Sequence, residues 1–412
     1  MLQLLRAKSP AQLRAQLSGR PGAVRRLRMR QDSTPENLDA IWSHLEAAGV
    51  APSVRSRIGD ATSRAEAETY GRSIENFIGT TKVPVGVIGP VRINGLHANG
   101  EFFVPMATSE AALVASYGRG ADIATMAGGI TAGLVSEGVL RTPAFVFDDV
   151  LQSGLFIDWV ARNAETLKVV AESTTRYGKL RAIEPFMDSN TVFLICRYTT
   201  GDASGQNMVT VATEAICAHI AANSPVTPRY AFVEGNFSGD KKASYLGMHT
   251  GRGRKVTASV ELPFELIERT LRVKPDALIA YGRVAALGAV LSGQLGSQAH
   301  YANALAAIYI ATGQDAACVA ESSVGFTRME PRHQAMFFSV TMPNVLVGSV
   351  GGGTALPSQA AALDMMGLAG AGKAAALAEV VAAVCLCGEI SIIAAIAGGQ
   401  FTRAHDKLAR HR

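Results

Sequence analysis

The stretch "RAIEPFMDSNTVFLICRYTT", residues 181–200, is strand-like throughout, and its surroundings decide the fold class. Helical stretches precede and follow it, over residues 154–174 and 205–224. Two shorter strand-like runs, "AFVFDDV" and "PRYAFVE", lie outside those helices. The resulting order of strand, helix, strand, strand, helix and strand is typical of a split βαβ module. We therefore predict a small α+β unit over residues 143–233, inserted between two parts of a larger domain.

The larger domain is predicted from the segments on either side of this unit. Short strands are expected over residues 83–106, mostly helix over 263–311 and a strand over 334–350. Two weakly charged stretches, 284–311 and 374–399, approach the length of a membrane span. We predict both as buried helices, because polar residues interrupt the first and the second carries Glu379 and Glu389.

The N-terminal region is basic and helical. Residues 1–31 contain eight Lys or Arg and no Asp or Glu, which indicates a basic arm or helix or, alternatively, an Arg-rich transit segment. Residues 33–72 are predicted as helical and surface-rich. Thr34 is expected to cap a helix whose first residue is Pro35.

Composition limits the classes of partner. The chain has 412 residues, 48% of them apolar, and a formal charge of +5, which favours a globular protein with anionic partners. Basic runs interleaved with aromatics are missing, so we predict no nucleic acid partner and expect phosphate-bearing small molecules. The five cysteines have neither zinc-site nor dithiol spacing, which favours a reducing compartment and no metal site.

Two glycine-rich segments are candidates for ligand binding. In "GSVGGGTALPSQAA", residues 348–361, a strand leads through glycines to a helix start, which suits an anion site and a tight turn equally. In "GDASGQNMVTVATEA", residues 201–215, a glycine allows close approach of a flat ligand, although a plain strand-to-helix turn is more common. Asp202 or Ser204 is expected to cap the following helix.

Four titratable residues raise further questions. The segment "NFSGDKKAS", residues 236–244, places Lys241 in either a solvated turn or a reactive site. Asp315, in "ATGQDAACVAESS", is predicted to cap a helix or to be a buried charge that needs a partner. Taken singly, Glu75 and His405 are typical of solvated surface positions.

Taken together, the ordered motifs give a stronger signal. From residue 73 to 405 the chain resembles the 3-hydroxy-3-methylglutaryl-coenzyme A (HMG-CoA) reductase family, and it is most similar to the class found in eukaryotes and archaea. The resemblance rests on "ENFIGTTKVPVGVIGP", "VPMATSEAALVAS", "GRGADI", "IYIATGQDAA", "GSVGGGTALPSQAAALDMMG" and "GEISIIAAIAGGQFTRAH". The membrane anchor that some members carry has no counterpart in this sequence, so no membrane span is expected.

The resemblance implies an α+β fold with an N-terminal helical domain, a large domain around a long central helix and an inserted ferredoxin-like small domain. It implies a dimer or tetramer with active sites at the subunit interface, and we expect a cytoplasmic homodimer. The implied boundaries are 1–60 for the helical region, 61–142 with 234–396 for the large domain, 143–233 for the cofactor-binding domain and 397–412 for a C-terminal flap.

The resemblance also implies the site residues and the cofactor. The implied catalytic residues are Glu75, Lys241, Asp315 and His405. The implied substrate-binding residues are Arg141, Glu234, Asp240, Lys242, Arg283, His300 and Asn303. NADPH would contact Thr175, Arg176, Lys179, Asp202, Ser204, Gly205, Gln206, Asn207, Gly351, Gly352, Gly353 and Thr354.

The implied reaction is the four-electron reduction of HMG-CoA to mevalonate and coenzyme A, which serves isoprenoid biosynthesis. NADPH supplies two hydrides, and Lys241 stabilises the oxyanion that each transfer creates. Asp315 and Glu75 form a coupled proton network with the lysine, and His405 protonates the departing thiolate.

Departures from the family pattern concentrate on the substrate side. Glu234 replaces the usual serine, Arg283 replaces a lysine, and Ser204 and Gln206 replace methionines. Unless an arginine neutralises it, Glu234 should repel the terminal carboxylate of the substrate by several kcal/mol, at about 4 Å and an effective dielectric near 20. Two alternatives therefore stay open: reduction of another acyl thioester, on coenzyme A or a carrier protein, and a non-catalytic binding protein.

Overall fold

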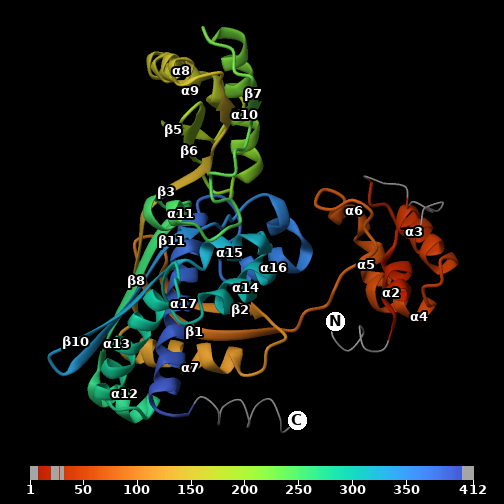
Figure 1. Cartoon of the computed structure of the whole chain (residues 1–412). Coiled ribbons are helices and arrows are strands. Elements are labelled where there is room, and N and C mark those ends of the chain that lie inside the picture. The colour runs from red at the N-terminus through yellow and green to blue at the C-terminus, as the bar shows by residue number, and fades with distance from the viewer. Residues whose placement is uncertain (1–7, 20–26, 28–31, 401–412) are drawn as a thin grey trace. The chain divides into compact units, whose positions relative to one another are not determined.

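The computed structural model describes residues 8–19, 27 and 32–400, so His405 lies outside the described residues. The chain divides into two compact units, Met1–Thr81 and Lys82–Arg412, whose relative position is not determined (Figure 1). Helices and strands alternate irregularly along the second unit, which confirms the predicted α+β class.

The first unit is helical. Its helices are α2 (Pro10–Leu17), α3 (Pro35–Ala47), α4 (Pro52–Ile58), α5 (Ala61–Ala65) and α6 (Ala67–Tyr70). The predicted cap is confirmed, because Thr34 accepts the amide of Asn37 and the helix begins at proline.

A small core explains where the first unit ends. Leu38 and Trp42 of α3 pack with Ala67 and Phe77, and all four side chains are buried. Because Ala67 and Phe77 belong to this core, the unit reaches Thr81, whereas the sequence placed the end of the N-terminal region at residue 60.

The second unit is built on two sheets that share β3 and so form one connected set of 11 strands, with the order β7-β4-β6-β3-β8-β11-β10-β9. Strand β1 pairs with β2 and β3, and β5 pairs with β6. The pairs β1–β3 and β9–β10 are parallel, and the others are antiparallel. The strands of the larger part are β1 (Val85–Gly95), β2 (Asn99–Ala107), β3 (Ile130–Arg141), β8 (Gly253–Pro263), β9 (Gly296–Ser297), β10 (Gly325–Arg332) and β11 (Ala335–Val345).

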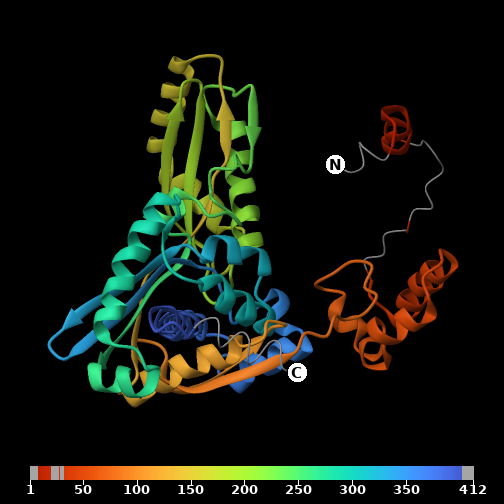
Figure 2. The same cartoon turned by 60° about the horizontal axis from the view of Figure 1, so that its bottom comes forward.

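Helix α17 (Ala374–Ala397) is the core of this unit. It packs against β3, β8 and β11 and against α7 (Leu113–Met126) and α14 (Tyr301–Thr312), and Figure 2 views it nearly end-on, in dark blue. The helix is long and apolar enough to cross a membrane, but 83% of its most apolar window is buried inside the fold. The buried helix predicted over residues 374–399 is therefore confirmed.

The single buried helix predicted over residues 284–311 is wrong. Helix α13 (Pro275–Leu291) ends before Gly293, whose φ is +69°, and the chain passes through β9 before α14 begins. Helix α14 is largely buried, whereas α13 exposes Val284, Leu287, Val290 and Leu291.

The remaining strands form a smaller sheet with the order β7-β4-β6-β5. Its elements in chain order are β4 (Ala144–Val146), α8 (Val150–Arg162), α9 (Ala164–Glu172), β5 (Lys179–Asp188), β6 (Thr191–Thr199), α10 (Gln206–Asn223) and β7 (Tyr230–Phe232). The end of β3 pairs with β6 while its earlier residues pair with β8, so one long strand joins both sheets (Figure 1).

Short helices complete the second unit. They are α11 (Tyr245–Thr250), α12 (Phe264–Leu271), η1 (Ala316–Cys318), α15 (Val319–Ser322), η2 (Gly352–Ala355) and α16 (Pro357–Met365).

Candidate active site

Lys241 and Asp315 form an ion pair at the surface of the second unit. The Nζ of Lys241 lies 3.0 Å from Oδ2 of Asp315, and both side chains are nearly half exposed. The hydrogen bond with Asp315 raises the pKa of Lys241. Partial burial acts to raise the pKa of Asp315, but hydrogen bonds from Lys241 and Ala317 outweigh it and leave that pKa below its usual value. Both groups are therefore charged at neutral pH.

Asp315 serves two purposes. It follows α14 and Gly313, and its Oδ1 accepts the amide of Ala317 at 3.0 Å as the cap of η1. The sequence predicted either a cap or a buried charge that needs a partner. The structure confirms the cap, and Asp315 has a partner in Lys241, but its side chain is exposed.

The backbone of Lys241 is held in an unusual conformation. Its φ is +57°, in the left-handed region, which costs a residue with a side chain roughly 1–2 kcal/mol. Its amide donates to Oε1 of Glu321 at 3.2 Å, and the carboxylate of Glu321 is ion-paired with Arg252. The orientation of the lysine is therefore imposed by its surroundings.

Arg141 lies between two carboxylates. Its NH1 is 2.9 Å from Oε2 of Glu234 and 3.3 Å from Oδ2 of Asp240, and Thr142 donates to the other oxygen of Glu234 at 3.0 Å. The neutralising arginine that Glu234 requires is thus present. A substrate carboxylate directed at Arg141 must compete with Glu234 for the same guanidinium.

A pocket of about 760 Å³ contains other predicted substrate contacts. It lies among residues of α7, α13, α14 and α17, and both His300 and Asn303 line it. The amide of His300 donates to Oε1 of Glu389 at 2.9 Å, and its Nδ1 is 3.1 Å from the hydroxyl of Tyr117. The buried carboxylate on α17 therefore holds His300 at the start of α14.

Two charged residues in this pocket were not predicted as site residues. Glu110 lines the pocket just before α7, and Arg119 lines it from within α7. Arg119 donates to Ser391, and in the described part of the chain no carboxylate pairs with it. Desolvation lowers the pKa of Arg119. Both residues lie in the family motifs "VPMATSEAALVAS" and "GRGADI", from which no site residue was predicted.

The predicted substrate and catalytic residues are thus not all in one place. Lys241, Asp240 and Asp315 do not line the pocket that contains His300 and Asn303. Lys242, which donates to the carbonyl of Asp240 at 2.9 Å, lies with Asp240 and Lys241 in the segment 236–244, the lysine loop. Arg283 lines a neighbouring pocket of about 390 Å³ together with Glu389. Glu75 belongs to the first unit, so its role stays a prediction.

The two glycine-rich motifs lie side by side. The amide of Ser349 donates to the carbonyl of Asp202 at 2.9 Å, and a Cβ added to Gly348 would lie 2.6 Å from the amide nitrogen of Ser204. The segments 201–207 and 348–354 therefore form one surface of closely packed backbone. Within the second motif, Thr354 donates to the carbonyl of Gly351 at 2.7 Å and closes the turn through Gly352 and Gly353.

The capping role expected of Asp202 or Ser204 is wrong. Gly205, with φ +77°, takes the N-cap position of α10, which has no side-chain cap. The carboxylate of Asp202 instead accepts the amides of Gly372 and Ala374 at 2.7 and 3.2 Å, at the start of α17. A local motif could not indicate this contact, because it joins segments far apart in the sequence.

Thr175, Arg176 and Lys179 belong to the segment that the family resemblance assigns to the adenosine 2′-phosphate of NADPH, and this segment lies against the first turn of α10. A Cβ on Gly178 would lie 2.8 Å from the sulfur of Met208. Thr175 accepts the amide of Gly178 at 3.1 Å, while Arg176 is exposed. Lys179 pairs with Glu172 at 2.9 Å, and this hydrogen bond holds the pKa of Glu172 below its usual value.

Comparison with known proteins identifies the family. A sequence profile described as hydroxymethylglutaryl-coenzyme A reductase matches residues 50–410. The 3-hydroxy-3-methylglutaryl-coenzyme A reductase of Aeropyrum pernix is 42% identical over 349 residues, which is 83% of each chain. That of Methanothermobacter thermautotrophicus is 40% identical over 82% of this chain and 85% of its own.

A solved structure shows the same fold. The class II reductase of Streptococcus pneumoniae, bound to NADPH in open conformations, superposes with a TM-score of 0.65 at 19% identity over 87% of this chain and 96% of that one. The sequence profile, the identities and the shared fold agree with the motifs found above. The chain belongs to the hydroxymethylglutaryl-coenzyme A reductase family.

Proposed function

We propose that this chain reduces HMG-CoA to mevalonate and coenzyme A with NADPH. The main support is the ion pair between Lys241 and Asp315, which holds the ammonium of Lys241 in a fixed orientation. The reaction of this family creates an oxyanion, and an oriented ammonium can stabilise that charge. The test is to mix the purified protein with NADPH and HMG-CoA and to follow absorbance at 340 nm. We expect about two NADPH oxidised per thioester.

Lys241 is the group that stabilises negative charge on the reacting carbonyl oxygen. Removing one such preorganised donor typically raises the barrier by about 3–4 kcal/mol. Asp315 keeps the ammonium in place and charged, because its hydrogen bond favours the protonated form. Bound NADPH supplies the two hydrides.

The two glycine motifs are the proposed binding surface for the dinucleotide. Gly348 lies against the backbone of 202–204, where a side chain on that residue would collide, and Asn207 is exposed at the start of α10. Arg176 is an exposed cation in the segment that lies against the same turn of α10. We assign residues 143–233 the cofactor-binding role on this basis.

The carboxylic acid that donates a proton to the alkoxide has two candidates. The sequence favours Glu75, whereas the pocket favours Glu110, which lines it beside His300 and Asn303. Comparing Glu75→Gln with Glu110→Gln decides between them. The residue whose amide variant loses kcat by at least about a hundredfold is the acid, given the usual contribution of general acid catalysis.

A second copy of the chain is proposed to complete the active site. The support is the separation of the predicted residues into the lysine loop and the pocket. Helix α13, which lines the pocket with Ala285 and Ala289, exposes Val290 and Leu291, and an exposed apolar face of this kind marks a protein contact.

Complementation tests this arrangement. Lys241→Ala inactivates the loop, and the double variant His300→Ala/Asn303→Ala inactivates the pocket. Co-expressed in one cell, the two chains should recover about a quarter of wild-type activity, because half of randomly formed dimers are mixed and each has one intact site. If the co-expressed chains are no more active than the two variants expressed separately, added together, the active site lies within one chain.

A second candidate function is reduction of a different acyl thioester. The contact between Glu234 and Arg141 favours it, because the guanidinium already carries a carboxylate partner. Oxidation of NADPH with another acyl-CoA or an acyl carrier protein, together with none with HMG-CoA, would select this candidate. A cytoplasmic location is also proposed, and the five free thiols support it.

A further inference from the structure

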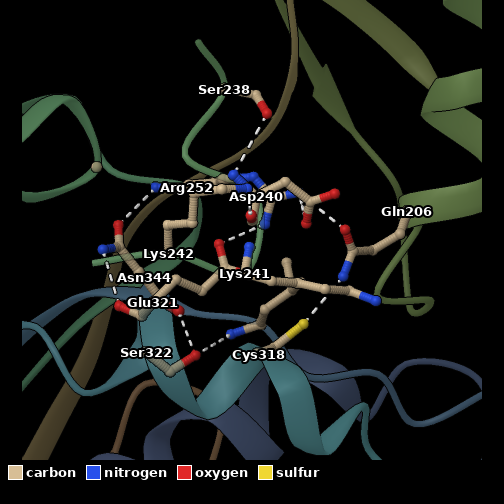
Figure 3. Close-up of polar contacts among 12 residues, drawn as sticks. Gln206, Ser238, Asp240, Lys241, Lys242, Arg252, Cys318, Glu321, Ser322 and Asn344 are labelled. Carbon is tan, nitrogen blue, oxygen red and sulfur yellow. Dashed lines mark hydrogen bonds and ion pairs between the residues drawn. The ribbon is translucent and has the colours of Figure 1, made fainter. Parts of the chain in front are cut away.

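Arg252 is a buried arginine that contacts three separate parts of the second unit (Figure 3). Its side chain is 1% exposed. Its NH1 pairs with Glu321, and its NH2 donates to Oδ1 of Asp240 at 2.9 Å and to Oε1 of Gln206 at 2.8 Å. Its own amide donates to Oδ1 of Asn344 at 2.9 Å, which fixes the backbone from which the side chain extends.

Two of these partners, Glu321 and Gln206, also contact the segments that carry Lys241 and Asp315. Glu321 accepts the amide of Lys241. Gln206 is the first residue of α10, and its Nε2 lies 2.9 Å from the sulfur of Cys318 in the 3₁₀ turn that Asp315 caps. A continuous set of contacts therefore joins the start of α10 to both members of the Lys241–Asp315 pair.

This connection matters because the backbone of Lys241 is in the left-handed region, which a lysine does not favour. The carboxylate of Glu321 that holds its amide is itself buried, and a buried carboxylate requires a cationic partner. Arg252 is that partner. The orientation of Arg252 depends in turn on the acceptors Asp240 and Gln206.

We propose that Gln206, Arg252 and Glu321 form a positioning relay that couples the start of α10 to the orientation of Lys241. This proposal rests on the proposed function. Gln206 is a positioning residue in this scheme and does not bind the cofactor, because both polar atoms of its amide contact other residues of the chain. Asn207, which is exposed on the same turn, is left to contact the dinucleotide.

Two substitutions of similar size separate these roles. Gln206→Met removes the acceptor for Arg252, since a thioether accepts hydrogen bonds only weakly, whereas Gln206→Glu keeps it. We expect Gln206→Met to lower kcat by at least about tenfold while the NADPH dissociation constant, measured by fluorescence without thioester, changes less than about threefold. Gln206→Glu should retain at least about half of the wild-type kcat.

The matched control is Asn207→Ala. It should raise the NADPH dissociation constant by more than about threefold, which is the pattern of a cofactor ligand. If Gln206→Met shows that pattern, or if the Met and Glu variants lose the same activity, the relay is wrong.

A measurement without turnover keeps the relay distinguishable from the proposed function. Competitive acetylation with acetic anhydride, read by mass spectrometry, gives the reactivity of Lys241 relative to its neighbour Lys242. We expect Gln206→Met to change this ratio at least about twofold relative to the wild type, because a displaced ammonium no longer has the charge of Asp315 beside it. An unchanged ratio overturns the relay, whereas a wild-type protein that reduces no thioester overturns the proposed function alone.

Discussion

Lys241 reaches Asp315 from a turn that contains no large aliphatic side chain, and polar contacts hold the lysine itself. Phe237, earlier in the same turn, stacks on Phe186 and Phe193. The sequence identified Lys241 and Asp315 through the family motifs. It could not show that the lysine adopts φ +57° or that Glu321 and Arg252 hold it there. Those contacts join segments that are far apart in the sequence, and the motifs carry no information on distance.

Replacing Lys241 with alanine should abolish reduction and preserve the fold. Loss of the oxyanion partner is expected to reduce kcat by about 10²–10³-fold. Thermal unfolding should change little, because an ion pair this exposed contributes little to stability. Turnover close to that of the wild type would contradict the assignment of Lys241.

The ion pair also predicts a pH dependence. The raised pKa of Lys241 means that its pairing persists below the usual lysine value and is lost as pH rises through the raised value. The lowered pKa of Asp315 means that pairing persists above the usual aspartate value and is lost as pH falls through the lowered value. In Asp315→Asn, the alkaline decline of kcat/KM should therefore move to lower pH. A decline at the same pH in both proteins would show that Asp315 does not control the lysine.

Glu234 is predicted to restrict the acyl group. Glu234→Ser frees Arg141 from one carboxylate and removes a negative charge near the substrate tail, so the KM for HMG-CoA should fall by at least about tenfold. Glu265→Ser, on the exposed side of α12, is the control for the change in net charge. An equal effect of both substitutions would point to overall charge, and an unchanged or raised KM would remove Glu234 from substrate selection.

At the scale of elements, periodicity and composition predicted whether a segment is a helix or a strand better than they predicted what that segment packs against. The strands over 83–106 and the buried helix over 374–399 are confirmed, because short β-branched runs broken by glycine indicate strands and a long apolar run indicates a buried helix. The single helix predicted over 284–311 is interrupted near Gly293, where a positive φ follows the end of α13. Whether an Ala- and Gly-rich helix faces the core or the solvent depends on what packs against it.

The cap formed by Asp202 yields a prediction for α17. Asp202→Ala leaves the amides of Gly372 and Ala374 without their carboxylate, and the free energy of unfolding should fall by about 1 kcal/mol. Ser204→Ala, which the sequence treated as an equal capping candidate, should leave it unchanged. Urea denaturation measures both variants. A larger loss of unfolding free energy in Ser204→Ala than in Asp202→Ala would instead support capping of α10 by Ser204.

At the scale of the whole molecule, the exposed face of α13 is the surface to test. Val290→Asp places a charge on the apolar face beside the pocket, so the protein should become monomeric and lose activity. Light scattering after gel filtration measures the mass. Leu151→Asp, on the exposed surface of α8, is the control and should leave the assembly intact. A dimer that survives Val290→Asp would remove α13 from the interface.

The sequence by itself determined the fold class, the family and the identity of most candidate site residues, because apolar periodicity and ordered motifs are local properties that survive divergence. It pointed to Glu75 as the carboxylic acid, whereas the pocket brings in Glu110 and Arg119. Only the tertiary structure decided which residues meet: Arg141 with Glu234, Asp202 with the start of α17, and Arg252 with Gln206 and Glu321. Each of these contacts joins charged or polar groups from distant segments. Their energy depends on distance and burial, which exist only once the chain has folded.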